Sequence, residues 1–426
     1  MKLPYIPDWL RFFFSRLRQR LWVRPLAMCL ISIAAVFAAA AADRSGLPLA
    51  LFAVNADSLV KLLSIMASSM LVIAIFSVSS MVAAYASASN TATPRSFPLV
   101  VADDVSQNAL STFVGAFIFS IVALVAVTNG HIAAAGRCVL FVMTMTVFAV
   151  VILTFVRWVD RVARLGRLST TIETVERTAA EALELRRRSP TLLGAPVSSS
   201  GGRRVCASSV GYVQRVDVPS LQKAAESKDW RVVVEALPGT FVSPGRALAR
   251  IIAGGEVLDD DGTEQVREAF TIGDNRLFDD DPRLGLIVLS EIAGRALSPA
   301  VNDPGTAIDI IGRLVRLLTA WSEPVTDERD RTDVNDRVEV PTLRADDLFD
   351  DAFTAIARDG AGSVEVVLRL QKGFASLASV EDPAVRQAAV THARRSLARA
   401  ELAMALPADL DAVRHVAARV TEKAAR

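Results

Sequence analysis

Four long apolar segments in the first 157 residues constrain this chain more than any other feature. They lie at about residues 25–42, 59–86, 109–129 and 138–156. A helix needs roughly 20 mostly apolar residues to cross about 30 Å of hydrocarbon. Inside a bilayer the backbone must satisfy its own hydrogen bonds, which a helix does. The sequence therefore predicts four transmembrane helices, the first of them retained and not cleaved as a signal peptide.

Composition divides the chain into two different parts. It is 52% hydrophobic with a mean hydropathy of +0.36, too apolar for an ordinary soluble enzyme of 426 residues. Beyond about Arg157, charged residues recur every few positions. We predict a mainly α membrane protein with a transmembrane domain at 1–157. An amphipathic helix and linker follow at 158–203, and a cytoplasmic α+β domain occupies 204–426.

The distribution of basic residues predicts the orientation, because Lys and Arg are retained on the cytoplasmic side. Eleven flank one set of helix ends and three flank the other. The eleven are Lys2, Arg11, Arg16, Arg18, Arg20, Arg24, Arg95, Arg157, Arg161, Arg164 and Arg167, and the three are Arg44, Lys61 and Arg137. An even number of spans agrees with this count. We expect a multi-pass protein of the bacterial plasma (inner) membrane with both termini in the cytoplasm.

Net charge and cysteine content limit the kinds of partner and cofactor that we expect. A net charge of +1 lacks the concentrated positive field that binds a phosphate backbone, so we expect the lipid bilayer and no nucleic acid as a partner. Cys29, Cys138 and Cys206 form neither a disulfide framework nor a metal motif. We expect no metal and no cofactor.

Polar residues inside the apolar segments are mostly hydroxyls. Lys61 lies at the outer end of the second segment, where its long side chain can reach the interface. The near absence of ionisable residues at depth argues against a proton-coupled pump. The hydroxyls could line a pore, although their four-residue spacing with alanines favours helix packing. They are Ser64, Ser68, Ser69, Ser77, Ser79, Ser80, Ser120, Thr144 and Thr146.

The second half contains a small β unit and then mainly helices. Strands are predicted in VCASSVGYVQRVD, WRVVVEAL and RALARII, with a short helix between the first two. Apolar spacing in DPRLGLIVLSEIAGRAL and TAIDIIGRLVRLLTAW predicts two packed helices. Further helices are expected near 345–358, 362–379, 383–405 and 408–424.

The segment SPAVNDPG separates the two packed helices. Asp303 can cap the second helix and Pro304 can occupy its first turn, where a missing N–H does no harm. No catalytic residue is assigned. The candidate motif residues are Ser298, Pro299, Asn302, Asp303, Pro304 and Thr306, together with Asp281.

The string RALSPAVNDPGTAIDIIGRL resembles the signature of a bacterial family of predicted integral membrane proteins whose domain has no assigned function. Supporting phrases occur in order, among them PGTFVSPGRALARI and FTIGDNRLFDDDPRLGL. The family pattern usually has a Gln-Asp pair where this chain reads Asp279, Asp280 and Asp281. The resemblance implies the architecture and no chemistry.

Three functions stay open. The first is an oligomeric channel or transport-related protein regulated by its cytoplasmic domain, since four helices are few to enclose a path. The second is a membrane-anchored scaffold or sensor. The third is an enzyme with an acidic site near the NDP turn, which the absence of a nucleophile elbow, P-loop or His-metal pair makes the weakest. His392 and His415 lie in Arg-rich helices and are expected to be solvated.

Overall fold

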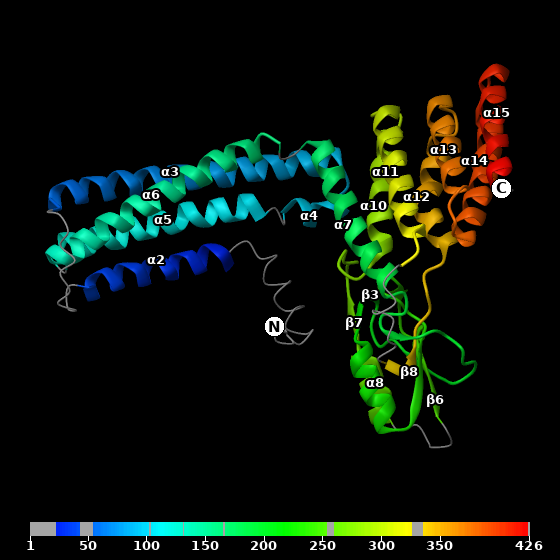
Figure 1. Cartoon of the computed structure of the whole chain (residues 1–426), viewed down its shortest axis with the longest axis horizontal. Helices are drawn as coiled ribbons and strands as arrows, with labels where there is room; N and C mark the ends of the chain where they lie inside the picture. Colours follow the sequence, from blue (N-terminus) through cyan, green and yellow to red (C-terminus); the bar gives the residue numbers. More distant parts are fainter. Residues whose placement is uncertain are drawn as a thin grey trace. The chain divides into compact units, whose positions relative to one another are not determined.

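The computed structural model describes residues 23–42, 54–101, 104–130, 132–164, 167–253, 260–325 and 335–424 (Figure 1). The chain divides into an N-terminal unit, Met1–Thr171, and a C-terminal unit, Ile172–Arg426. Most of the basic residues counted before the first apolar segment, and Arg44, lie outside the described residues.

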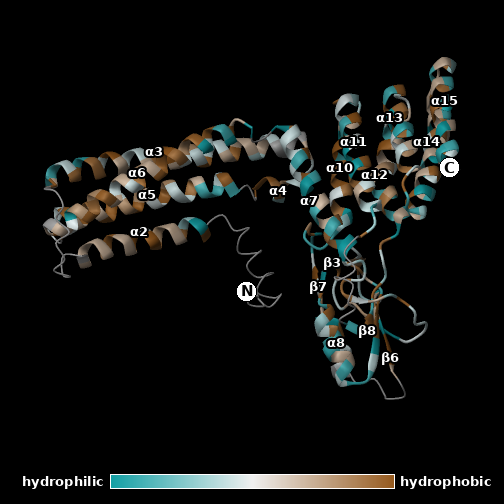
Figure 2. Cartoon of the chain, viewed as in Figure 1, coloured by the Kyte–Doolittle hydropathy of each residue, from teal (hydrophilic) through white to brown (hydrophobic). Residues whose placement is uncertain are grey.

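Four helices of the N-terminal unit are long and apolar enough to cross a membrane, which confirms the four predicted spans. They are α2 (Val23–Ala42), α3 (Ala56–Thr91), α5 (Asp104–Thr128) and α6 (Ala134–Val162). Most extend several residues beyond the predicted limits. Figure 2 shows that hydrophobic residues predominate along these helices. A short 3-10 turn, Pro94–Ser96, and α4 (Phe97–Val101) connect α3 to α5.

Helix α5 is central in this unit and packs against α2, α3 and α6. Its buried Phe113 and Phe119 belong to two apolar clusters that fill the space between the helices. Gly115 allows α2 to approach closely, because a Cβ there would lie 3.0 Å from Cβ of Met28. Arg24 at the start of α2 pairs with Asp104 at the start of α5. The two helices therefore run in the same direction.

The C-terminal unit opens with α7 (Leu168–Arg188), whose first turn contains the unit boundary, and continues into two β-sheets. The larger sheet has the order β1-β8-β4-β6-β2 and the smaller one β5-β3-β7. The strands are β1 (Gly194–Ala195), β2 (Arg203–Cys206), β3 (Gly211–Val216), β4 (Trp230–Val234), β5 (Phe241–Val242), β6 (Ala247–Ala253), β7 (Phe270–Gly273) and β8 (Asn335–Glu339). Helix α8 (Val218–Ser227) lies between β3 and β4 in the chain, and α9 (Asp260–Glu268) lies between β6 and β7.

The β region is larger than the sequence indicated. The stretch 189–203, interpreted as a linker, contributes β1 to the large sheet beside β8. Alternating Val side chains of β4 turn toward a shared core, in which Trp230, Val232 and Val234 are buried. Strand β8, which follows helix α11 (Pro304–Ser322) in the chain, was not predicted; it joins the sheet by pairing in parallel with β4.

Six helices form a two-layered array in the rest of the unit. Helices α10, α12 and α14 pack side by side in one layer, and α11, α13 and α15 in the other (Figure 1). They are α10 (Pro282–Ala296), α11 (Pro304–Ser322), α12 (Ala345–Asp359), α13 (Val364–Leu377), α14 (Pro383–Ala403) and α15 (Pro407–Ala424). Helices α10, α11 and α14 each begin with an Asp cap followed by Pro, which ends the preceding loop sharply.

Candidate functional site

The SPAVNDPG segment, residues 298–305, forms the turn between α10 and α11. The backbone N–H of Asn302 donates to the carbonyl of Ser298 at 2.8 Å, and that of Asp303 donates to Ala296 at 2.7 Å. Asn302 has a φ of 49°, a left-handed conformation that Asn tolerates better than most residues. The turn therefore ends α10 and reverses the chain through local hydrogen bonds.

Asp303 caps α11, as the sequence predicted. Its carboxylate accepts hydrogen bonds from the hydroxyl of Thr306 at 2.5 Å and from the backbone N–H of Thr306 at 3.1 Å. These bonds lower the pKa of Asp303 below its ordinary value. Pro299 and Asn302 are exposed, whereas Ser298, Pro304 and Thr306 are half-buried. The hydroxyl of Ser298 donates to the carbonyl of Arg295.

Asp281 lies at the other end of α10 and is buried, with 2% of its surface exposed. It caps α10 by accepting from the backbone N–H of Arg283 at 3.2 Å. Its two oxygens also accept hydrogen bonds from Nε and Nη2 of Arg276, at 2.6 and 3.0 Å. This bidentate, charge-assisted pair is the strong form of an ion pair.

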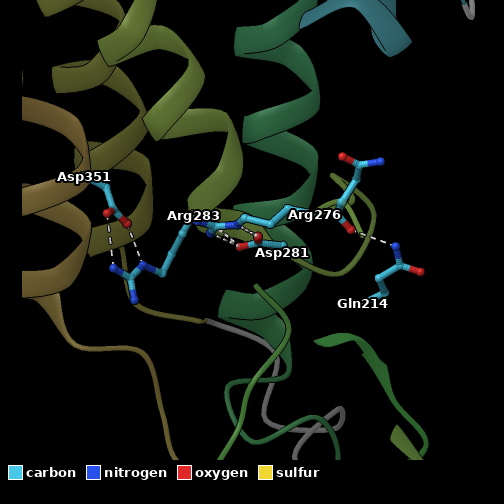
Figure 3. Close-up of polar contacts among 6 residues, drawn as sticks. Gln214, Arg276, Asp281, Arg283 and Asp351 are labelled. Carbon is cyan, nitrogen blue, oxygen red and sulfur yellow. Dashed lines mark hydrogen bonds and ion pairs between the residues drawn. The ribbon is translucent and has the colours of Figure 1, made fainter. Parts of the chain in front are cut away.

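A second bidentate pair continues the network into the helix array. Nε and Nη2 of Arg283 donate to the carboxylate of Asp351 on α12 at 2.5 and 3.2 Å (Figure 3). We call Arg276, Asp281, Arg283 and Asp351 the charged joint. Burial alone would lower the pKa of Arg283, but Asp351 more than offsets this and raises it.

The charged joint also contacts the β region. A Cβ on Gly239 would lie 2.4 Å from Oδ2 of Asp281, and Gly239 has a φ of +90°. Its turn closes with the N–H of Thr240 donating to Leu237, the pattern of a type II turn with Pro238 and Gly239 in the centre. Nearby, Gln214 of β3 donates to the carbonyl of Asn275 at 2.7 Å (Figure 3). The joint thus holds a β turn, α10 and α12 together.

Arg186, near the end of α7, adds a third positive charge to this region. Its side chain is 3% exposed, and within the described residues neither Nη atom has a hydrogen-bond partner. Burial lowers its pKa to about 10, although the charges of Asp280 and Asp281 act in the opposite direction. Burying an arginine whose Nη atoms have no hydrogen-bond partner costs free energy. The negative charges of Asp280 and Asp281, near the start of α10, offset part of this cost.

The structure separates the candidate residues into two places. Asp281 and the SPAVNDPG turn lie at opposite ends of α10, a helix of 15 residues and so about 22 Å long. Both oxygens of Asp281 accept hydrogen bonds from Arg276, so Asp281 itself is not a free base. Among the described residues no group of three or more His, Cys, Asp or Glu side chains could hold a metal ion. This arrangement gives the enzyme hypothesis no support.

The histidine prediction was wrong for one of the two. His392 is 4% exposed and packs against Phe349 and Phe374. Burial lowers its pKa. It lies on the face of α14 that Val385, Ala388 and Ser396 share, so the helical spacing could have revealed its burial. His415 lies in α15 and contacts Arg419 on the exposed surface.

Sequence reasoning also missed most members of the charged joint. It identified Asp281 but not Arg276, Arg283 or Asp351, and it did not single out Arg186. The alternation of acids and arginines in GDNRLFDDDPR was the available signal. Asp351 lies 68 residues from Arg283, and only folding brings the two together.

Comparison with known proteins defines the family. The family described as predicted membrane protein DUF2254 matches residues 18–376, and the chain belongs to it. Uncharacterised proteins of Mycobacterium bovis and of Mycobacterium tuberculosis are each 33% identical over 107 residues. That stretch is 24% of this chain and 20% of each relative, so the chain matches only about a fifth of their length. No solved structure matches.

Proposed function

We propose that this member of the DUF2254 family is an oligomeric protein of the bacterial plasma membrane in which copies of α3 line a polar path for a small solute. The C-terminal unit lies in the cytoplasm and regulates that path. One observation carries the proposal, a polar face on the outer surface of α3.

This polar face consists of Lys61, Ser64, Ser68 and Ser79, all exposed, and the exposed apolar side chains of Val72 and Ile75 lie on the same side between Ser68 and Ser79. Their spacings of three, four and eleven residues keep them on one side of a helix. Among the described residues, the hydroxyl of Ser68 donates to the carbonyls of Ser64 and Ile65, and that of Ser79 to the carbonyl of Ile75, all within α3. A second copy of α3, or water between copies, would satisfy this face better than lipid does.

The interior of the N-terminal unit favours a path between chains over one within a chain. Buried Leu63, Phe119 and Leu140 occupy one half of it, and Phe113 and Trp158 the other. Ser120 and Thr144 are buried as well, and each donates to a carbonyl of its own helix. These buried apolar side chains pack between the helices of one chain, which favours a path between chains over one within a chain.

The orientation is supported by two observations. Helices α2 and α5 run in the same direction, which fits alternating spans with both ends of the unit on one side. Arg24, Arg95, Arg157, Arg161 and Arg164 flank ends that such an arrangement places on that side. We infer that this side is the cytoplasm.

A second candidate is a membrane-anchored sensor without a path. An open cleft lined by arginines in the β region favours it, because such a cleft is suited to a soluble anion. In this alternative, the α3 helices of two copies would pack directly against each other, with no water between them.

Cysteine labelling tests the path. In a chain with Cys29, Cys138 and Cys206 replaced by alanine, Ser68→Cys and Ser79→Cys are reconstituted in vesicles and exposed to a charged, water-soluble thiol reagent. We expect both to react and to form disulfide-linked dimers on oxidation. Leu153→Cys, on a 62% exposed site of α6, is the lipid-facing control and should do neither.

The outcomes separate the two candidates. Reagent labelling together with cross-linking supports the path. Cross-linking at Ser68→Cys and Ser79→Cys without labelling would instead support a dry seam and the sensor. If neither variant differs from Leu153→Cys, the α3 face is not an interface and the proposal is wrong.

A further inference from the structure

The large sheet of the C-terminal unit carries a row of charged residues on one face. Arg204 of β2 pairs directly with Arg250 of β6, and Arg250 pairs with Val233 of β4. Residues that pair across strands point to the same side, so Arg204 and Arg250 are neighbours on one surface. Val232 and Val234 point to the opposite side and are buried in the core.

An open cleft of about 540 Å³ lies on this face. Its lining includes Arg204, Arg246, Arg250 and Glu235 as the charged groups, with Val197 and Pro341 among the apolar ones. This volume falls within the usual range for sites that take a small molecule. The cleft thus joins an apolar wall to a strongly basic one.

The positive charges that line the cleft outnumber its negative charges. Three arginines face one glutamate, which gives a formal charge of +2. Glu235 is already paired with Nε of Arg250 at 2.6 Å. Among the described residues neither Arg204 nor Arg246 pairs with an acidic side chain, and both are exposed. Like charges directly opposite each other on neighbouring strands destabilise a sheet, so an anion between them would relieve repulsion.

We propose that this cleft binds a small molecule that carries phosphate groups, with the phosphates on Arg204, Arg246 and Arg250 and an apolar part against Val197 and Pro341. A phosphate brings about −1.5 to −2 charges near pH 7, close to the excess of the cleft, and accepts bonds in several directions. Guanidinium groups match it through paired N–H donors. The proposal stands apart from the α3 path and holds for a sensor equally.

The first experiment titrates inorganic pyrophosphate into the purified full-length chain in detergent at low salt, by isothermal calorimetry and thermal unfolding. We expect saturable binding and a rise in the unfolding temperature. Succinate at the same concentrations should bind at least tenfold more weakly. No binding of pyrophosphate at millimolar concentration, or equal binding of succinate, would overturn the proposal.

Variants locate the site. Arg204→Ala and Arg246→Ala should each weaken pyrophosphate binding roughly tenfold or more, because each removes a charge-assisted contact. Arg369→Ala removes the same charge from an exposed position on α13 and should leave binding unchanged. If Arg369→Ala weakens binding as much as Arg204→Ala, the effect is one of net charge and the cleft is not the site.

A variant that binds more tightly is also needed, because misfolding could explain a loss of binding but not a gain. Glu235→Gln removes the competing carboxylate from Nε of Arg250, whose Nη1 keeps its bond to the carbonyl of Gly201, so pyrophosphate should bind about threefold more tightly. Weaker binding of this variant would contradict the assignment. Repeating the titration in nanodiscs with and without phosphatidic acid identifies the source of the phosphate. If phosphatidic acid weakens the binding of pyrophosphate, the natural ligand is a lipid headgroup. If it does not, the ligand is a soluble metabolite.

Discussion

At the scale of single residues, Asp281 is a buried carboxylate that joins several parts of the C-terminal unit. It caps α10, binds Arg276 through two bonds and lies against Gly239. Asp281→Asn would leave the charges of Arg276 and Arg186 without their nearest compensation. We expect a loss of about 3 kcal/mol in the free energy of unfolding, measured by thermal or denaturant unfolding of the full-length chain in detergent.

The control for this change lies two positions away. Asp279 is exposed, and Asp279→Asn should alter the free energy of unfolding by less than about 0.5 kcal/mol. Equal effects of the two variants would mean that the charged joint contributes nothing beyond general electrostatics.

Glu339, at the end of β8, makes stability depend on pH. Burial alone would raise its pKa, but the hydroxyl and backbone N–H of Ser199, with those of Ser198, outweigh this and lower it to about 2. A carboxylate whose pKa is depressed by folding contributes stability above its unfolded pKa, near 4.5, and that contribution fades as the pH falls toward 2. The unfolding temperature should therefore drop over this window.

Glu339→Gln should flatten that dependence, because an amide does not titrate. Thermal unfolding between pH 2 and 7 measures it. Ser199→Ala removes one of the bonds, at 2.6 Å, and should give an intermediate slope. An unchanged slope in Glu339→Gln would assign the acid sensitivity to other carboxylates.

At the scale of secondary structure, α7 is fixed to α10 by a close approach of backbones. A Cβ on Gly285 would lie 2.4 Å from Cβ of Ala179 and 2.9 Å from its Cα. Glu176 of α7 also binds Arg313 and Arg316 of α11. Gly285→Ala forces the helices apart and should cost about 1–3 kcal/mol of unfolding free energy, seen as a lower unfolding temperature.

A matched glycine on the next helix should behave in the opposite way. Gly312 of α11 has no heavy atom within 4 Å of an added Cβ. Gly312→Ala should raise the free energy of unfolding by up to about 1 kcal/mol, because alanine favours the helix. Destabilisation by both substitutions would contradict the geometry of the α7–α10 contact.

Periodicity explains why most elements could be predicted. Helix α11 places Ala307, Ile310, Ile311 and Leu314 on its buried face, and the same spacing was visible in the sequence. Strands β1 and β5 are only two residues long, and β8 follows α11 far from its partners in the chain. Strands β1 and β5 form because each pairs with the edge of a sheet, and β8 forms because it fits between β1 and β4. No local sequence pattern predicts such pairings.

At the scale of the whole molecule, the exposed polar face of α3 and the basic cleft concern different units. The polar face of α3 bears on assembly in the membrane, and the basic cleft on the binding of a phosphate-bearing ligand. The labelling and titration experiments can therefore fail independently. Success of both would describe an oligomer with a ligand-binding domain, which is the regulated path proposed above.

The sequence by itself determined the four apolar spans, the division into a membrane part and an α+β part, and the cap at Asp303. Each of these follows from local quantities: apolar length, charge density along the chain, and hydrogen bonds within a few residues. Tertiary structure decided the rest. The Arg283–Asp351 pair, the burial of His392 and the alignment of Arg204 with Arg250 join residues distant in the chain. Their partners depend on packing and strand register, which are properties of the folded chain alone.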